Sequence, residues 1–198
     1  MAIRKKNKNI LLIGVVSLFL VSLMGCGKAP IPRPYGYFRI DLPPHTYTRF
    51  DSAVLPYSFE VSHTAKVRQR LADNESYWID IIYPAFNASI YCSYKPIHHN
   101  LFELNEDTRK IVYKHTVRAD AIGEKVFTNA DKSVYGILYS LEGNTASQIQ
   151  FVLTDSVKHF FRAALYFENT PNKDSISPVG EYIKQDMQHL METFEWKK

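Results

Sequence analysis

The stretch His159-Phe-Phe-Arg-Ala-Ala-Leu-Tyr-Phe167 decides how this chain is expected to fold. Successive side chains of a β-strand point to opposite faces of a sheet. The two faces of this stretch carry Phe161, Ala163, Leu165 and Phe167 on one side, and Phe160, Arg162, Ala164 and Tyr166 on the other. Because both sets contain aromatic side chains, we expect the sheet to be covered on both faces over part of its area.

Other segments on either side of this stretch show the same strand-like alternation. The expected strands are Tyr37–Ile40, Tyr57–Val61, Tyr77–Tyr83, Ala88–Tyr94, Lys125–Thr128, Val134–Leu141 and Ser147–Thr154. Turn-forming residues separate several of them, and these turns are expected at 84–87, 129–132 and 142–145.

Two segments change to a helical period. Between Asn100 and Ala119 apolar residues recur at three and four positions, and the acids precede the bases, as the helix dipole prefers. A closing helix is expected to start near Ser177-Pro178, with Ser177 as the N-cap. Its apolar stripe consists of Val179, Ile183, Met187, Leu190 and Phe194. The sequence therefore predicts an α+β domain, a largely antiparallel sheet packed by two main helices. This element order is similar to that of the Mog1/PsbP-like sandwich.

The N-terminus has the features of an exported lipoprotein. Positive charges at positions 4–8 precede an apolar run from Ile10 to Met24, which is too short to span the roughly 30 Å hydrocarbon layer as a helix. The run ends in Leu23-Met24-Gly25 before Cys26, the pattern that lipoprotein signal peptidase accepts. We expect residues 1–25 to be a removed signal peptide and Cys26 to carry the lipid; the alternative is an uncleaved N-terminal anchor.

Cleavage would change the charge and the cysteine count. The chain has 24 Lys and Arg against 20 Asp and Glu, and the signal segment holds four of the bases and no acid. The chain from Cys26 onward is therefore neutral, which removes the charge argument for nucleic-acid binding. Cys92 would be the remaining thiol, and its place in a strand-like run predicts a small buried residue.

The first residues after Cys26 predict a tether. Alternating prolines make residues 26–34 an extended, Pro-rich segment, and residues 35–198 form a single globular domain. Gly27 follows the lipidated cysteine, which under the enterobacterial sorting rule indicates the outer membrane. The domain opens with Tyr35, Tyr37, Phe38 and Arg39. These residues are a candidate partner contact, because Tyr and Arg are enriched at interface hot spots; alternatively they form an ordinary edge strand.

The sequence contains no common catalytic or metal-binding motif. His98 and His99 have no other ligand type at a suitable spacing, so no metal and no cofactor is expected. His115, Arg118 and Asp120 are a candidate polar cluster, although a histidine on a helix stripe is commonly a core residue. No catalytic residue is assigned, and we expect a protein without enzymatic activity.

Three Asp-Ser-aliphatic triplets resemble the O-glycosylation acceptor motif of exported Bacteroidota proteins. The candidate acceptors are Ser52, Ser156 and Ser175. The alternative interpretation is ordinary turn chemistry, in which Asp and Ser are both common.

Four long segments of the chain form a recognisable set. They are Pro32-Arg-Pro-Tyr-Gly-Tyr-Phe-Arg-Ile-Asp-Leu-Pro43, Tyr113-Lys-His-Thr-Val-Arg-Ala-Asp-Ala-Ile122, Leu153-Thr-Asp-Ser-Val-Lys-His-Phe-Phe-Arg162 and His189-Leu-Met-Glu-Thr-Phe-Glu-Trp196. In these segments the chain resembles one family, the gliding motility lipoprotein GldD of Bacteroidota. The resemblance implies a membrane-anchored envelope lipoprotein required for gliding motility and for the associated type IX secretion machinery. Other gliding and secretion envelope proteins would be its partners.

Three hypotheses follow for the function. The first is a non-catalytic component of the cell envelope that acts through protein contacts. The second is a module that binds a small or lipidic ligand between sheet and helix, which would require an open apolar cavity. The third is a periplasmic hydrolase that uses His115 with an unrecognised partner.

Overall fold

The computed structural model describes residues 40–70, 77–114, 119–168 and 173–197. They belong to one compact unit, Arg39–Lys198. The strands and helices follow in the order β1 (Tyr47–Phe50), β2 (Tyr57–Ser62), β3 (Lys66–Gln69), β4 (Ile79–Tyr83), the 3-10 turn η1 (Pro84–Phe86), β5 (Ala88–Pro96), α2 (Leu101–Tyr113), β6 (Ala119–Asn129), β7 (Val134–Gly143), β8 (Ile149–Thr154), β9 (His159–Phe167), α3 (Lys173–Thr193) and β10 (Glu195–Trp196).

Seven of the strands form one sheet with the order β3-β4-β5-β9-β8-β7-β6. All the pairings recorded between them are antiparallel. The stretch that suggested the fold, β9, is the central strand, between β5 and β8. One row across the sheet runs from Ile79 to Lys125 and places Cys92, Ala163, Phe151 and Leu138 in register.

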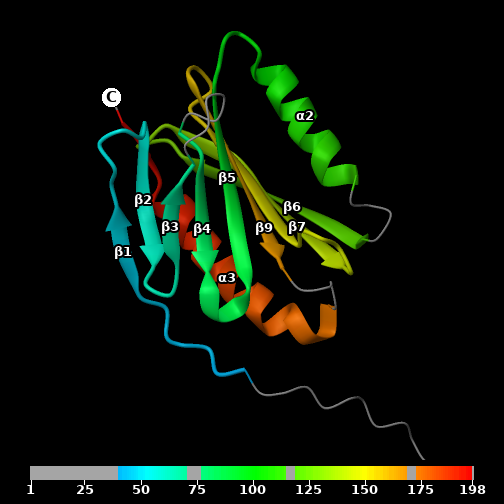
Figure 1. Ribbon diagram of the computed structural model, residues 1–198. Helices are drawn as coiled ribbons and strands as arrows, with labels where there is room; N and C mark the ends of the chain where they lie inside the picture. Colours follow the sequence, from blue (N-terminus) through cyan, green and yellow to red (C-terminus); the bar gives the residue numbers. More distant parts are fainter. Residues whose placement is uncertain (1–39, 71–76, 115–118, 169–172, 198) are drawn as a thin grey trace, which may run out of the picture. The chain divides into compact units, whose positions relative to one another are not determined.

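Both faces of this sheet are covered where β9 lies, as expected. We call the face toward α3 the inner face and the face toward α2 the outer face (Figure 1). Phe161 belongs to the larger apolar cluster of the inner face, which includes the α3 residues Ile183 and Met187. Phe160 belongs to a smaller cluster on the outer face, with Leu104 of α2.

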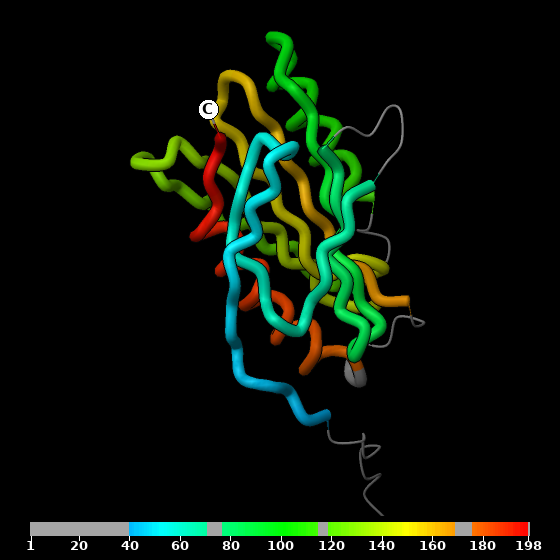
Figure 2. The backbone as a smooth tube through the Cα atoms, turned by 60° about the vertical axis from the view of Figure 1, so that its left-hand side comes forward, coloured from blue at the N-terminus to red at the C-terminus, as the bar shows by residue number. Residues whose placement is uncertain are grey.

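A second, three-stranded sheet has the order β1-β2-β10, again with antiparallel pairs. The middle strand β2 pairs with β1 on one side and with the last strand on the other. Figure 2 shows the C-terminal residues running beside β2. The aromatic side chains of β2, Tyr57 and Phe59, are fully buried in the larger cluster.

The structure confirms the predicted α+β class with a largely antiparallel sheet and two main helices. The turn after β4 was also predicted correctly: η1 ends at Asn87, whose φ of 47° lies in the left-handed region that asparagine tolerates. All five residues of the expected stripe, from Val179 to Phe194, are buried, although Phe194 follows the last residue of α3.

Several boundaries differ from the prediction. The closing helix begins at Lys173, so Ser177 is not its N-cap and Pro178 lies inside it. Proline is costly inside a helix because it removes one backbone hydrogen bond, and packing of the rest of α3 outweighs this cost. The expected strand at 37–40 lies mainly outside the described residues, and Ile40 is not in a strand. No helix in the described part of the chain combines the length and the hydrophobicity needed to cross a membrane.

Candidate functional site

Most residues singled out in the sequence fall outside the part of the chain that the structure describes. These are Leu23, Met24, Gly25, Cys26, Tyr35, Tyr37, Phe38, Arg39, His115 and Arg118. Lipidation of Cys26, the aromatic partner contact and the His115–Arg118–Asp120 cluster therefore remain predictions.

Asp120 is the member of that cluster that the structure describes. It lies at an irregularity in the register of β6 with β7, between Ala119 and Ala121. It lines a surface cavity of about 400 Å³ between the end of β7 and α3, together with Glu142, Gln148, Glu181 and Lys184. The cavity is polar and mainly acidic, and in the described chain no group of three or more metal-ligating residues is found.

A buried carboxylate joins three distant parts of the described chain, and the sequence did not predict it. The side chain of Asp186 on α3 is 2 % exposed. Its Oδ1 lies 2.7 Å from Nδ1 of His45 and accepts a hydrogen bond of 3.0 Å from Tyr47. Its Oδ2 accepts a 3.0 Å bond from Tyr83 of β4. We call these four residues the Asp186 cluster; it ties the first described residues, α3 and the seven-stranded sheet together.

Ring stacking extends the cluster along α3. The rings of His45 and Tyr182 stack with centroids 4.2 Å apart. Those of Tyr47 and His189 stack at 3.6 Å. Nε2 of His189 lies 2.7 Å from a carboxylate oxygen of Glu60 in β2. The segment at 45–47 is therefore held on one side of α3 by two aromatic stacks and two hydrogen bonds.

The electrostatics of the cluster favour a structural role. Burial, and then the Asp186 charge, raise the pKa of Tyr47 and of Tyr83 well above the usual tyrosine value. Both phenols therefore stay protonated and donate to the carboxylate. A carboxylate that accepts from two phenols and a histidine has its acceptor sites largely occupied, so Asp186 is poorly placed to take a proton from a substrate.

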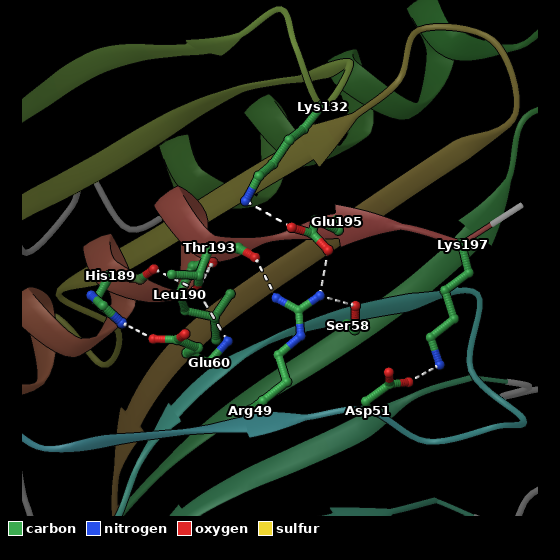
Figure 3. A network of polar contacts seen from close by, with 10 residues as sticks. All are labelled: Arg49, Asp51, Ser58, Glu60, Lys132, His189, Leu190, Thr193, Glu195 and Lys197. Atoms are coloured by element: carbon green, nitrogen blue, oxygen red, sulfur yellow. Dashed lines mark hydrogen bonds and ion pairs between the residues drawn. The ribbon is translucent and has the colours of Figure 1, made fainter.

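A second polar network fixes the C-terminal strand (Figure 3). Arg49 of β1 donates to Glu195 of β10 and, over 2.7 Å, to the hydroxyl of Ser58. Lys132, from the turn after β6, lies 2.9 Å from the same glutamate. These hydrogen bonds from Lys132 and Arg49 lower the pKa of Glu195. The first and last strands of the small sheet are therefore joined by side chains as well as through β2.

Two arginines contact a buried acid and two aromatic rings beside β3 and β4. Asp80, 2 % exposed, receives hydrogen bonds of 2.9 Å from Arg68 and 2.8 Å from Arg70. The guanidinium of Arg70 also lies over the rings of Trp78 and Tyr91. Paired arginines on a buried acid with aromatic neighbours form a rigid patch of the residue types found at protein interfaces.

Cys92 is a buried free thiol in β5, as its position in a strand-like run predicted. Burial raises the pKa of this thiol, so it carries no thiolate at neutral pH and has no nucleophilic character.

The three candidate glycosylation serines lie in different settings. Ser156 is exposed in the turn between β8 and β9, with a φ of 65°. Ser52 lies in the loop after β1, and its carbonyl accepts from Lys197. Ser175 lies in the first turn of α3. Exposure in a turn makes Ser156 more accessible than Ser52, which is half-buried.

The Asp186 cluster left one signal in the sequence. Asp186 stands between Ile183 and Met187 on the face of α3 that carries the apolar stripe, where an acid needs a buried partner. Its partners could not be found this way, because His45 and Tyr47 lie in a polar segment without apolar periodicity.

The sequence model of the gliding motility lipoprotein GldD family matches residues 27–196 of the chain. No curated protein matches the sequence significantly. A similar solved structure is the solution structure of cyanobacterial PsbP (CyanoP) from Synechocystis sp. PCC 6803. It shares 9 % sequence identity, and the match covers 85 % of this chain and 99 % of the other, with a TM-score of 0.46. A TM-score below 0.5 supports no inference from that protein to this one.

Proposed function

We propose that this chain, which belongs to the gliding motility lipoprotein GldD family, is a non-catalytic component of the gliding apparatus and of its associated type IX secretion machinery. It would act through contacts with other envelope proteins. The family places it in the cell envelope as a membrane-anchored lipoprotein.

The observation that carries the proposal is the extent of the family match. It runs from residue 27 to residue 196, so it covers every described strand and helix. The chemistry of the described residues agrees with a non-catalytic role. Among the described residues, Asp186 is the most buried acid that contacts a histidine, and its oxygens already form hydrogen bonds that hold the fold together. The thiol of Cys92 is buried.

The anchor belongs to the proposal. We propose that Cys26 carries the lipid, that residues 26–34 form the tether, and that Gly27 directs the protein to the outer membrane. More than one acyl chain on the cysteine would hold the protein on the membrane stably.

The two alternative functions have weaker support. A ligand module needs an open apolar cavity between sheet and helix, but aromatic side chains fill the centre of that space. Among the described residues it holds Phe151, Phe161 and Phe194, each at most 1 % exposed. The hydrolase hypothesis depends on His115, which lies outside the described residues, and Asp120 lines a cavity dominated by acids.

The proposal is tested by removing the anchor and leaving the domain intact. Cells that carry Cys26→Ala are compared with cells that carry Cys92→Ala, which removes the other cysteine at a buried site. Colony spreading, secretion of type IX substrates and the amount of the protein in the envelope are measured. Cys26→Ala is expected to lower spreading and secretion at least tenfold, whereas Cys92→Ala leaves both near wild type. Normal spreading and secretion in Cys26→Ala cells would overturn the proposal.

A further inference from the structure

The strand β6 ends the seven-stranded sheet and has one recorded neighbour. It pairs with β7 along its whole length, from Ala119 to Asn129, and no other strand in the described part of the chain pairs with it. Its second edge therefore presents backbone N–H and C=O groups that no strand uses. Such an edge is a template for a further strand.

The length and exposure of β6 distinguish it from the opposite end of the sheet. β3 has four residues, whereas β6 has 11, which correspond to about 36 Å of extended chain. Val126 lies near the middle of β6 and faces outward opposite Ile137. Its side chain is 74 % exposed, an unusual position for a β-branched apolar residue in an 11-residue strand.

A small cavity runs along β6 on the inner face. It has a volume of about 100 Å³ and is lined by Lys125 and Phe127 of β6, Leu138 of β7, and Gln188, Met191 and Glu192 of α3. A strand added beside β6 would direct every second side chain toward this cavity. The acid at its rim, Glu192, favours a cationic side chain there.

The charges of β6 restrict how two copies of the strand can pair. In an antiparallel pair of identical strands related by a two-fold axis, directly opposite residues point to the same face of the sheet. The axis therefore passes beside one residue, which lies opposite its own copy. A register centred on Glu124 or on Lys125 opposes two like charges, which destabilises the pair. A register centred on Val126 opposes valine to valine and places Lys125 opposite Phe127 and Glu124 opposite Thr128.

That register is also complementary on the inner face. Lys125 of each copy would lie beside the cavity of the other copy, whose rim carries Glu192. Two lysines and two glutamates then face the same space, so the group is neutral. The apolar contact at the axis, the charge match at the cavity and the like-charge repulsion in the registers centred on Glu124 and Lys125 all favour the same arrangement.

We propose that a second copy of this chain docks on the free edge of β6, antiparallel and centred on Val126, so that the two seven-stranded sheets become continuous. The occupant is this chain itself, because the edge is complementary to its own copy in the register centred on Val126.

A cysteine scan in intact cells tests the register. The full lipidated chain is produced with Val126→Cys, Glu124→Cys or Phe102→Cys, and a mild oxidant is added before non-reducing electrophoresis and immunoblotting. Opposed residues of an antiparallel pair are close enough for a disulfide, so Val126→Cys is expected to give mostly covalent dimer. Glu124 lies opposite Thr128, so Glu124→Cys alone stays monomeric, and Glu124→Cys combined with Thr128→Cys restores the dimer. Phe102, exposed on α2 at 77 %, is the matched control for random collision.

A second measurement does not depend on disulfide chemistry. The full chain is purified in detergent and its mass is measured by light scattering. Wild type is expected to be a dimer and Val126→Asp a monomer, because two carboxylates would meet at the axis. The monomer should remain folded, because the side chain of Val126 is 74 % exposed in the single chain and its replacement removes no contact of the fold, although loss of the dimer contact itself lowers the thermal midpoint.

Three results would overturn the proposal. They are a monomeric wild type together with no Val126→Cys dimer, dimers of Phe102→Cys or Glu124→Cys as abundant as those of Val126→Cys, and a dimer that Val126→Asp leaves intact. None of them bears on the anchor experiment with Cys26→Ala, so the two proposals can fail separately.

Discussion

Nδ1 of His45 lies 2.7 Å from Oδ1 of Asp186, across 141 positions of the chain. His45 stands at the start of the described domain and Asp186 in its last helix. Tyr47 and Tyr83 donate to the same carboxylate. One buried acid therefore connects the first described residues, the seven-stranded sheet and α3. Force applied to the chain before His45 would reach α3 through this contact.

Removal of this acid should destabilise the domain strongly. Asp186→Ala leaves the buried phenol of Tyr83, the half-buried phenol of Tyr47 and a histidine without their acceptor. We expect the free energy of unfolding to fall by about 3 kcal/mol. Glu60→Ala is the control, because it breaks the contact with His189 through a side chain that is 38 % exposed, and should cost about 1 kcal/mol or less. Thermal or urea unfolding of both variants measures the difference; equal losses would contradict the structural role of Asp186.

Two glycines should respond differently to alanine. A Cβ at Gly136 would lie 2.0 Å from the carbonyl oxygen of Val152, which is backbone of the neighbouring strand. Gly136→Ala should therefore cost about 3 kcal/mol or more. At Gly180 the near atom is Oε1 of the Gln148 side chain, at 2.8 Å. This side chain can move away, and alanine favours the helix by about 1 kcal/mol, so Gly180→Ala should be close to neutral. Urea midpoints of the two variants test the order.

The turn between β8 and β9 should make stability depend on pH. Burial lowers the pKa of His159, so the unfolded chain binds more protons than the folded one below its ordinary value of about 6.5. The contribution of His159 is full above that pH and is lost as the pH falls through the folded pKa. His159→Gln should therefore flatten the melting temperature between pH 7 and pH 5 relative to wild type. Parallel curves for the two proteins would refute this assignment.

Asp155 should make the stability of the domain depend on pH in a lower range than His159 does. Burial tends to raise its pKa, but hydrogen bonds from the backbone N–H groups of His159, Lys158 and Val157 outweigh burial, and the pKa is lowered. Its contribution is therefore present above the unfolded value of about 3.9 and is lost as the pH falls through the folded pKa. Asp155→Asn should lose less stability than wild type between pH 4 and pH 2, measured by thermal unfolding at each pH.

The native thiol should be unreactive. Cys92 is 2 % exposed and burial raises its pKa, so a thiol reagent should label it only when the protein unfolds. Ser156→Cys, exposed in a turn, should be labelled within seconds in the same assay. Mass spectrometry after timed quenching gives both rates, and rapid labelling of native Cys92 would show that β5 opens readily.

The sequence predicted the parts of the fold that depend on local periodicity. The alternation in β9 indicated a sheet covered on both faces, and the stripe from Val179 to Phe194 indicated a buried closing helix. It missed β1, β3 and β10, which are two to four residues long. These strands depend on pairing with distant residues such as those of β2, and a short polar segment such as Lys66–Gln69 has no pattern that indicates this.

The candidate site was harder to predict for the same reason. Asp186 could be recognised as an acid on an apolar stripe, but nothing near it in the chain indicates His45, Tyr47 or Tyr83. Ser177-Pro178 was a misleading local signal, because α3 already begins at Lys173. The preferences of serine and proline at helix starts concern the local chain alone. The start of α3 at Lys173 depends instead on how the apolar stripe of the whole helix packs against the sheet.

The position of β2 between the first and last strands has a consequence for the timing of folding. A lipoprotein chain is exported with its N-terminal side first, so β1 and β2 emerge before the rest of the domain and can pair at once. The other edge of β2 stays open until Glu195 and Trp196 have been released. Completion of the small sheet must therefore wait for Glu195 and Trp196, and loss of these two residues would leave β2 paired on one edge only.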